Sequence, residues 1–331
     1  MISDTRRTSK PAAGGADAGT ERPTVTVGVP VLNEERHIQR CLDAVFTQSY
    51  PNITEVLVAD GGSADGTRDI VAGCPDERVR LLDNPRRIRP AGLNVMLAAA
   101  TAEIFVRVDA RTTLANDYVE RCVDALERTN AAMVGGPMRY TASSPAERGI
   151  QAAMMSRLGA GPAPFRREEG EGRFVDTVYL GAYRLATVRE LGCYDEYFGG
   201  NEDAELAFRA QRAGGVYLDP AIWSSYAVRE GLAPLWQQFR RYGKARAVTI
   251  RKHPSSLSAR QLAVPALVLG IASPWRKPVV TAYLAIVCAR AALESVRQDA
   301  TTGAVLAVAL PTMHAAWAVG FVEGMVTGPA T

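Results

Sequence analysis

The chain has 331 residues, of which 47% are hydrophobic and 22% charged, and its formal net charge is +3. This length allows one large domain or two modest ones, with a sizeable core. The mild charge gives no reason to expect nucleic acid as a partner, although a basic surface helps a protein to lie on an anionic membrane. The three histidines and five cysteines are widely spaced, which indicates reduced thiols and no metal-binding cluster of these residues.

The first residues differ in composition from the rest. Residues 1–23 are rich in Ala, Gly, Thr and Arg and contain no apolar run. A signal peptide requires such a run, so we predict a disordered leader and expect the domain that follows to stay in the cytoplasm.

From residue 24 onwards, apolar runs typical of buried strands alternate with helical periodicity. The predicted strands are 24–31, 55–60, 79–82 and 104–108, and the predicted helices are 35–46, 66–72 and 90–100. This alternation predicts an α/β fold with a mostly parallel sheet and helices on both faces. Loops at the carboxyl ends of such strands build the ligand site, and Asn33, Asp60 and Asp109 follow three of these strands.

The second half of this domain carries weaker signals. We predict helices at 118–128, 146–158, 185–191 and 204–213, and short strands at 132–135 and 215–218. Residues 159–173 are rich in Gly, Pro and charge, which predicts a mobile loop.

The tail is strongly apolar. Its apolar runs are 261–273, 278–293 and 302–322. A membrane-spanning helix needs about 20 apolar residues. The first run is too short, the second is marginal, and the third contains Pro311 and His314. Two interpretations remain: a buried helical subdomain, or helices that lie in or on a membrane with Arg276 and Lys277 on the cytoplasmic side.

Several polar groups suit the parts of a sugar nucleotide. A base and a ribose need carboxylate or amide partners, a diphosphate needs cations, and transfer to a hydroxyl needs a carboxylate base. Each group also has a simpler explanation: a turn at 60–63, a solvated charge run at 85–90, and a helix N-cap at 201–203. Together, their order along the chain favours a nucleotide-sugar site, and no GxGxxG motif after the first strand points to a dinucleotide instead.

The chain resembles the family 2 glycosyltransferases with the GT-A fold, and within them the succinoglycan-type exopolysaccharide glucosyltransferases. The resemblance covers about residues 24–255 and rests on the segments TVTVGVPVLNEE (24–35), VLVADGGSADGT (56–67), NPRRIRPAGLN (84–94), FVRVDART (105–112), DTVYLGAYR (176–184), GCYDEYFGGNEDAELAFRAQRAGG (192–215) and QFRRYGKAR (238–246). A weaker similarity extends to residues 314–324 of the tail.

The resemblance implies a role for each matching position. The Glu-Asp motif makes Asp203 the general base beside Glu202, and the Gln-x-x-Arg-Trp motif, here with Tyr, places Arg241 on the leaving diphosphate. Gln238 and Tyr242 of that motif would line the diphosphate and acceptor site. The expected nucleotide- and donor-binding residues are Pro30, Asn33, Glu34, Asp60, Gly61, Ser63, Asn94, Asp109 and Arg111.

The sequence departs from the family pattern at one position. The second acid of the Asp-x-Asp motif, usually the main metal ligand, is Arg111 here. A guanidinium cannot bind a cation but can itself pair with a diphosphate. Either Asp109 and the phosphates hold Mg²⁺ or Mn²⁺, or Arg111 takes over part of the cation's role.

The resemblance implies an inverting enzyme that moves a hexose, glucose by the branch it resembles, from UDP to a saccharide. A membrane tail favours a lipid-linked acceptor and a cell-membrane location with the active domain in the cytoplasm. The alternative is a non-catalytic nucleotide-sugar-binding scaffold in a polysaccharide assembly complex. The expected domains are 24–255 (halves 24–115 for the nucleotide and 116–255 for the acceptor) and a membrane-associated helical tail at 256–331.

Overall fold

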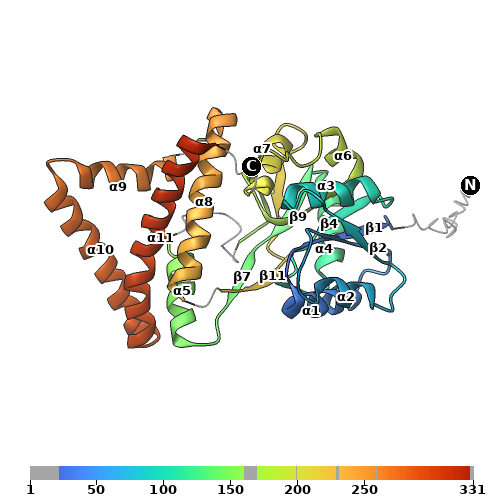
Figure 1. Cartoon of the computed structure of the whole chain (residues 1–331), viewed down its shortest axis with the longest axis horizontal. Coiled ribbons are helices and arrows are strands. Elements are labelled where there is room, and N and C mark those ends of the chain that lie inside the picture. Colours follow the sequence, from blue (N-terminus) through green and yellow to red (C-terminus); the bar gives the residue numbers. More distant parts are fainter. Residues whose placement is uncertain (1–21, 160–169, 199, 229–230, 258, 329–331) are drawn as a thin grey trace, which may run out of the picture.

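The computed structural model describes residues 22–159, 170–198, 200–228, 231–257 and 259–328. The predicted leader and most of the predicted loop at 159–173 lie outside these ranges. Figure 1 shows a sheet-centred part beside a helical part that is built mainly from the end of the chain.

The central sheet has eight strands. Their spatial order is β3 (Val79–Asp83), β2 (Ile53–Asp60), β1 (Val25–Val31), β4 (Ile104–Arg107), β9 (Tyr179–Arg184), β6 (Met133–Gly136), β10 (Val216–Leu218) and β8 (Arg173–Val175). The first four strands are mutually parallel, β6 and β10 are also parallel, and β9 and β8 run antiparallel to their neighbours. The predicted mixed and mostly parallel sheet is therefore confirmed.

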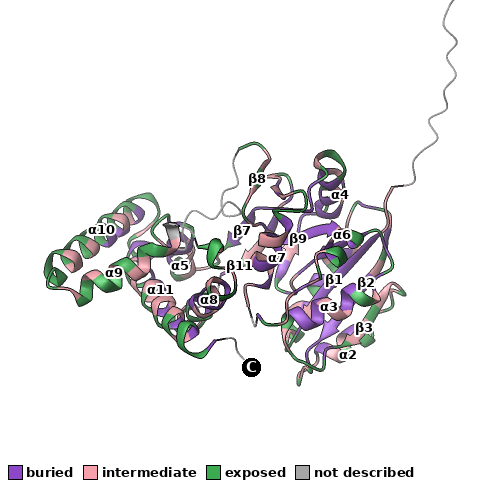
Figure 2. Ribbon diagram, turned by 90° about the horizontal axis from the view of Figure 1, so that it is seen from above, coloured by how far each residue is buried: buried purple, intermediate pink, exposed green. Residues whose placement is uncertain are grey.

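Helices cover both faces of this sheet. One core contains residues of α1 (Glu35–Phe46), α2 (Thr67–Ala72) and α4 (Tyr118–Thr129), and the other contains residues of α3 (Arg89–Ala99), α6 (Leu185–Glu190) and α7 (Glu202–Ala210). Alternate residues of one strand serve opposite cores, as with Val56 and Leu57 in β2. Figure 2 shows the central strands of this sheet in the colour of buried residues.

The sequence did not predict several short strands. A second, three-stranded sheet consists of β5 (Thr112–Leu114), β11 (Ser224–Ala227) and β7 (Met138–Thr141). Runs of three or four residues are too short to show an alternating pattern. β9 is longer, but two features hide it in the sequence. Its backbone is irregular, with positive φ values of 62° at Leu180 and 108° at Gly181, and its sequence contains no run of β-branched residues.

A third core joins the tail to the main domain. It contains residues of α5 (Pro145–Met155), α8 (Leu232–Lys252) and α11 (Ala300–Thr327). α8 and α11 approach closely at glycines: a Cβ on Gly320 would lie 1.9 Å from the Arg240 carbonyl oxygen, and one on Gly243 would lie 2.0 Å from that of Trp317. Arg240 also forms an ion pair with Glu323 of α11 at 2.8 Å. The tail is therefore not a separate appendage.

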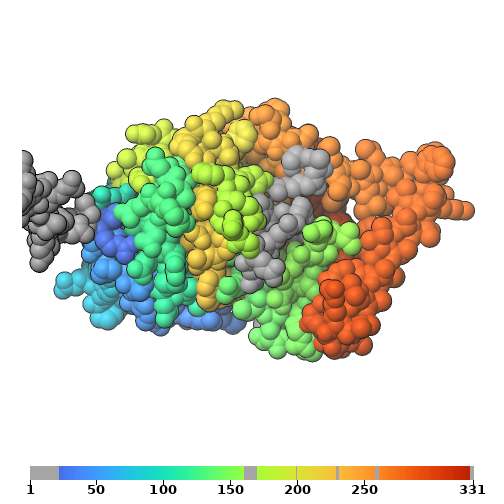
Figure 3. Space-filling model, turned by 180° about the vertical axis from the view of Figure 1, so that it is seen from behind, coloured from blue at the N-terminus to red at the C-terminus, as the bar shows by residue number. Residues whose placement is uncertain are grey.

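The apolar runs of the tail form helices, as predicted. They are α9 (Ala263–Ala272), α10 (Arg276–Arg297) and α11, and the latter two are long and apolar enough to cross a membrane. No residue of α9 and few residues of α10 are buried, whereas α11 contributes to the third core. Figure 3 shows this tail extending from one side of the molecule.

Candidate active site

The loops after β1 and β2 are joined by hydrogen bonds. The backbone N–H of Asn33 donates to Ser63 Oγ at 2.8 Å, and the N–H of Ala64 donates to Asn33 Oδ1 at 2.8 Å. Asn33 has a φ of 54°, a left-handed conformation that asparagine tolerates better than most residues. Pro30 pairs in register with Ala59, and Gly61 donates its N–H to the Val31 carbonyl at 2.9 Å. The predicted donor-binding residues of these two loops therefore lie together.

Asp60 organises the second of these loops. It is 1% exposed, and its Oδ2 accepts hydrogen bonds from the Gly62 N–H at 3.0 Å, the Ser63 N–H at 3.1 Å and Arg68 at 2.8 Å. Its Oδ1 accepts from Ser63 Oγ. An ionised carboxylate has about four acceptor positions. In this state Asp60 therefore shapes the turn, and a nucleobase would have to replace one of these donors to bind it.

Burial and these hydrogen bonds act on the pKa of Asp60 in opposite directions. Burial raises the pKa, but the bonds from Ser63 and Arg68 outweigh it and hold the pKa below 3.8. Asp60 is consequently an ionised anchor.

Glu34 and Arg111 bind each other. Arg111 Nε lies 2.9 Å from both carboxylate oxygens of Glu34, across the space between the loop after β1 and the loop after β4. Both residues were predicted to contact the donor. In this state each already has a partner of opposite charge, so a diphosphate would compete with Glu34 for Arg111.

Arg107 connects the two acidic motifs. Its Nη2 lies 3.2 Å from Asp109 Oδ1 and 3.1 Å from Glu202 Oε1. Arg107 and Glu202 are 2% and 1% exposed, and Arg89 from α3 adds a longer contact of 3.4 Å to Glu202. A buried carboxylate needs such a partner because desolvation penalises its charge. Arg107 thus joins the Asp-x-Asp strand end to the start of α7.

Two polar atoms of this cluster have no protein partner. Arg107 Nη1 and Glu202 Oε2 are both buried without a hydrogen bond. Burial tends to raise the pKa of Glu202, but Arg89 and Arg107 lower it more. The same balance lowers the pKa of Asp109. Both carboxylates are therefore held in the charged form.

Asp203 has the opposite balance. Burial and the neighbouring charge of Glu202 raise its pKa above 3.8, and Arg107 and Arg89 offset this only partly. A carboxylate whose pKa is raised holds a proton more readily, which suits a group that accepts one during a reaction.

The C-terminal end of α8, with the residue that follows it, contacts the segment around Asp203 at three points. Asn201, which has a φ of 65° and precedes α7, donates from its side-chain amide to Thr249 Oγ1 at 2.9 Å. Lys252 forms an ion pair with Asp195, and His253 Nε2 lies 3.1 Å from Glu205 Oε1. α8 also carries Gln238, Arg241 and Tyr242 at helical spacing, and Gln238 donates to the Tyr242 hydroxyl at 2.8 Å. One helix therefore bears one predicted motif and holds another in place.

Comparisons with known proteins identify the family of the chain. The sequence model of the family described as Glycosyl transferase family 2 matches residues 26–184. The protein "Succinoglycan biosynthesis protein ExoA" of Rhizobium meliloti (strain 1021) is 33% identical over 305 residues, which cover 88% of this chain and 92% of that protein. The chain belongs to glycosyltransferase family 2. The family resemblance and the enzyme class expected from the sequence are thus confirmed, and this glycosyltransferase acts in polysaccharide or glycolipid synthesis.

Other similar proteins extend the comparison. A Methanococcus voltae protein named "Dolichyl N-acetyl-alpha-D-glucosaminyl phosphate 3-beta-D-2,3-diacetamido-2,3-dideoxy-beta-D-glucuronosyltransferase" is 25% identical, with 93% of this chain and 98% of that protein covered. The solved mannosyltransferase PcManGT from Pyrobaculum calidifontis, in complex with GDP-Man and Mn²⁺, has a TM-score of 0.60 at 24% identity and covers 93% of this chain and 89% of its own. This last likeness shows the fold, which is GT-A.

Asn94 of the glycosyltransferase, which the sequence predicts to contact the donor, forms hydrogen bonds with the segment that precedes α7. Its amide donates to the Tyr194 carbonyl at 2.8 Å and to Glu196 at 2.9 Å, and its oxygen accepts from the Tyr194 N–H. It lines a polar hollow of about 570 Å³ together with Lys252 and His253. These bonds connect α3 to residues 194–196, which precede the Glu202-Asp203 motif.

Sequence reasoning missed two residues of the site. Arg107 is the one charged residue of β4, and a charge inside a buried strand was the available signal. Thr249 gave no signal, because its partner Asn201 is 48 residues away in the chain.

Proposed function

We propose that the glycosyltransferase moves a hexose from a UDP-sugar to a saccharide hydroxyl with inversion at the anomeric carbon. The observation that carries this proposal is the Arg107 bridge, which brings Asp109 and Glu202 together beside Asp203. Burial and the charge of Glu202 raise the pKa of Asp203. This cluster supports a donor site and a proton acceptor that lie beside each other.

In the proposed reaction, Asp203 takes the proton from the acceptor hydroxyl while that oxygen forms a bond to the anomeric carbon. The bond from this carbon to the diphosphate oxygen breaks at the same time, and UDP leaves with the electron pair. Arg241 stabilises the negative charge that develops on the diphosphate, with Arg111 as a second cation once it releases Glu34.

The divalent cation is part of this proposal. Among the described residues, no three of His, Cys, Asp and Glu lie close enough to form a metal site. Mg²⁺ is often held by one or two carboxylates together with substrate phosphates, and Asp109 fits that mode. A cation bound in this way would neutralise diphosphate charge, and PcManGT with its Mn²⁺ supports the idea by analogy.

We further propose a lipid-linked acceptor and a cell-membrane location with the active domain in the cytoplasm. The support is the apolar tail and the name of the Methanococcus voltae relative, which describes transfer to a dolichyl-linked sugar phosphate. The residue limits of the domains, 24–255 and 256–331, stay a prediction.

A non-catalytic nucleotide-sugar scaffold is the second candidate. The Arg111–Glu34 pair favours it, since the second acid of Asp-x-Asp is replaced by a cation that is already paired.

Purified protein and membranes should be assayed with a panel of nucleotide sugars, with and without EDTA. Transfer that is lost by several orders of magnitude in Asp203→Asn, with UDP binding retained, supports the enzyme. UDP-sugar binding without transfer or hydrolysis in the wild type supports the scaffold.

A further inference from the structure

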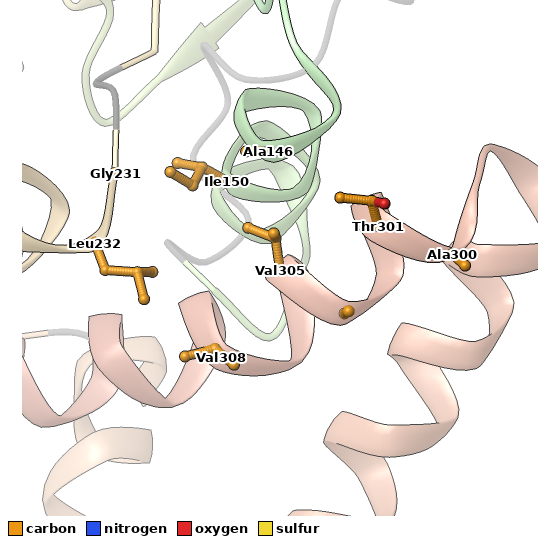
Figure 4. A pocket seen from close by; sticks show the side chains of 9 residues that line it. Ala146, Ile150, Gly231, Leu232, Ala300, Thr301, Val305 and Val308 are labelled. Carbon is orange, nitrogen blue, oxygen red and sulfur yellow. The ribbon is translucent and has the colours of Figure 1, made fainter.

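An apolar groove lies beside the first residues of α8. It encloses about 530 Å³ between α5, α8 and α11. Figure 4 shows Ile150, Leu232, Val305 and Val308 approaching one another from these three helices. Thr301 is the one polar residue among those that line it.

The groove is formed by a second apolar face of α11. Thr301, Ala304, Val305 and Val308 are spaced by three or four residues and therefore lie on one side of the helix. Ala304 and Val308 are exposed, whereas Leu306 and Leu310 are fully buried in the third core. α11 is thus apolar both where it packs and where it is open, which is unusual for a surface that only water covers.

The position of the groove connects it to the site. Tyr226 of β11 lies opposite Thr112 of β5, and Thr112 follows Asp109 by three residues. Gly231, at the edge of the groove, comes five residues after Tyr226. From Leu232 to Arg241, α8 rises by about 14 Å at 1.5 Å per residue. The groove therefore lies at one end of the helix that carries the diphosphate motif.

We propose that this groove holds the hydrocarbon chain of the lipid-linked acceptor, so that the saccharide head extends around the start of α8 to the face that carries Arg241. This inference rests on the proposed function. The lining offers no charged group, so a nucleotide or a phosphate would find no partner there. Its volume is in the range of known ligand pockets, roughly 300–1,000 Å³.

The surroundings favour a lipid over a protein segment as the occupant. Leu293 and Val296, which precede the turn into α11, are exposed. α9 contains only apolar residues and buries none of them, so it is apolar on every side. A helix that packs against protein on one side needs only one apolar face, whereas a helix that is apolar on every side is suited to a surrounding lipid phase. A hydrocarbon chain that enters the groove from the side of α9 and α10 would therefore remain partly in the lipid.

The first test narrows the groove. In Ala304→Trp, the KM for an acceptor with a long polyprenyl chain should rise about tenfold or more, because buried chain contacts are lost. The KM for the same saccharide on a short alkyl group, and the rate of donor hydrolysis, should stay unchanged. Ala315→Trp, at an exposed position of the same helix, is the control for bulk. Equal effects on both acceptors, or no effect on either, would overturn the proposal.

The second test measures binding without turnover. A long-chain polyprenyl phosphate that carries an environment-sensitive fluorophore at the end of its hydrocarbon chain is titrated with the wild type, Ala304→Trp and Ala315→Trp, and its spectral shift should be lost only in Ala304→Trp. A saturable blue shift supports the groove, and the same shift with phospholipid that carries the same fluorophore at equal concentration reveals a general lipid contact and contradicts it. Because this readout needs no transfer, it separates failure of the groove from failure of the proposed function, which donor hydrolysis and short-chain transfer report.

Discussion

Thr249 accepts a hydrogen bond from the Asn201 side chain at 2.9 Å, although Asn201 precedes α7 and Thr249 lies near the end of α8. Thr249 is 1% exposed, and its own hydroxyl donates to the Ala245 carbonyl at 2.9 Å. Asn201 directly precedes Glu202 and Asp203 and holds a left-handed φ of 65°. The bond therefore fixes the backbone from which the proposed base projects.

Thr249→Val keeps the size of the side chain but removes the acceptor. We expect kcat to fall about five- to tenfold, the cost of one hydrogen bond that positions a reacting group, with the donor KM within about twofold. Thr249→Ser restores the hydroxyl and should restore kcat. Steady-state kinetics on the three proteins decide this, and an equal change in kcat and donor KM would show that the bond serves general stability.

Arg107 should contribute strongly to folding because it compensates two buried carboxylates. Arg107→Met leaves Glu202 and Asp109 without this partner and should lower the free energy of unfolding by about 3–5 kcal/mol. The double variant Arg107→Met/Glu202→Gln removes one of those charges and should recover part of the loss. Urea denaturation of the wild type, Arg107→Met, Glu202→Gln and the double variant in detergent measures the coupling. Additive losses would mean that the two side chains do not interact.

The sequence was informative where the chain is locally regular. β2 ends on Asp60, and Asn33 and Asp109 each come two residues after the end of β1 and β4. These positions could be located because buried strands and the polar residues that follow them are adjacent in the chain. The partners of these residues could not be predicted. Glu34 pairs with Arg111, and Arg107 with Glu202, across 77 and 95 positions, through geometry that only the folded sheet creates.

The raised pKa of Asp203 should be visible in the pH dependence of kcat/KM. A general base must be unprotonated, so activity falls as pH drops through its pKa. Burial and the charge of Glu202 raise that pKa above 3.8, which places the acidic limb higher than for an ordinary aspartate. Arg107→Met removes a cation that favours the carboxylate, so the limb should move to still higher pH. A limb that stays in place would argue against Asp203 as the titrating group.

Arg111 should determine how strongly the enzyme depends on a metal. Arg111→Asp creates the acidic pair of the Asp-x-Asp motif, so we expect activity to require lower Mn²⁺ concentrations for saturation and to become more sensitive to EDTA. Arg111→Gln loses the cation without adding a ligand and should instead raise the donor KM. Activity measured across a Mn²⁺ titration compares the variants. Identical titrations for the wild type and Arg111→Asp would place the metal, if bound, away from this position.

The packing of α11 on α8 predicts a specific sensitivity at Gly320. A Cβ there would lie 1.9 Å from the Arg240 carbonyl oxygen, a backbone atom that cannot turn aside. Gly320→Ala, which ordinarily stabilises a helix, should therefore lower the midpoint of thermal unfolding in detergent, because the two helices must separate. Ala315→Val on the exposed side of α11 controls for substitution in this helix. If Gly320→Ala instead raises the midpoint, the two helices are not in close contact in solution, and the tail does not hold α8 against the segment that contains Glu202 and Asp203.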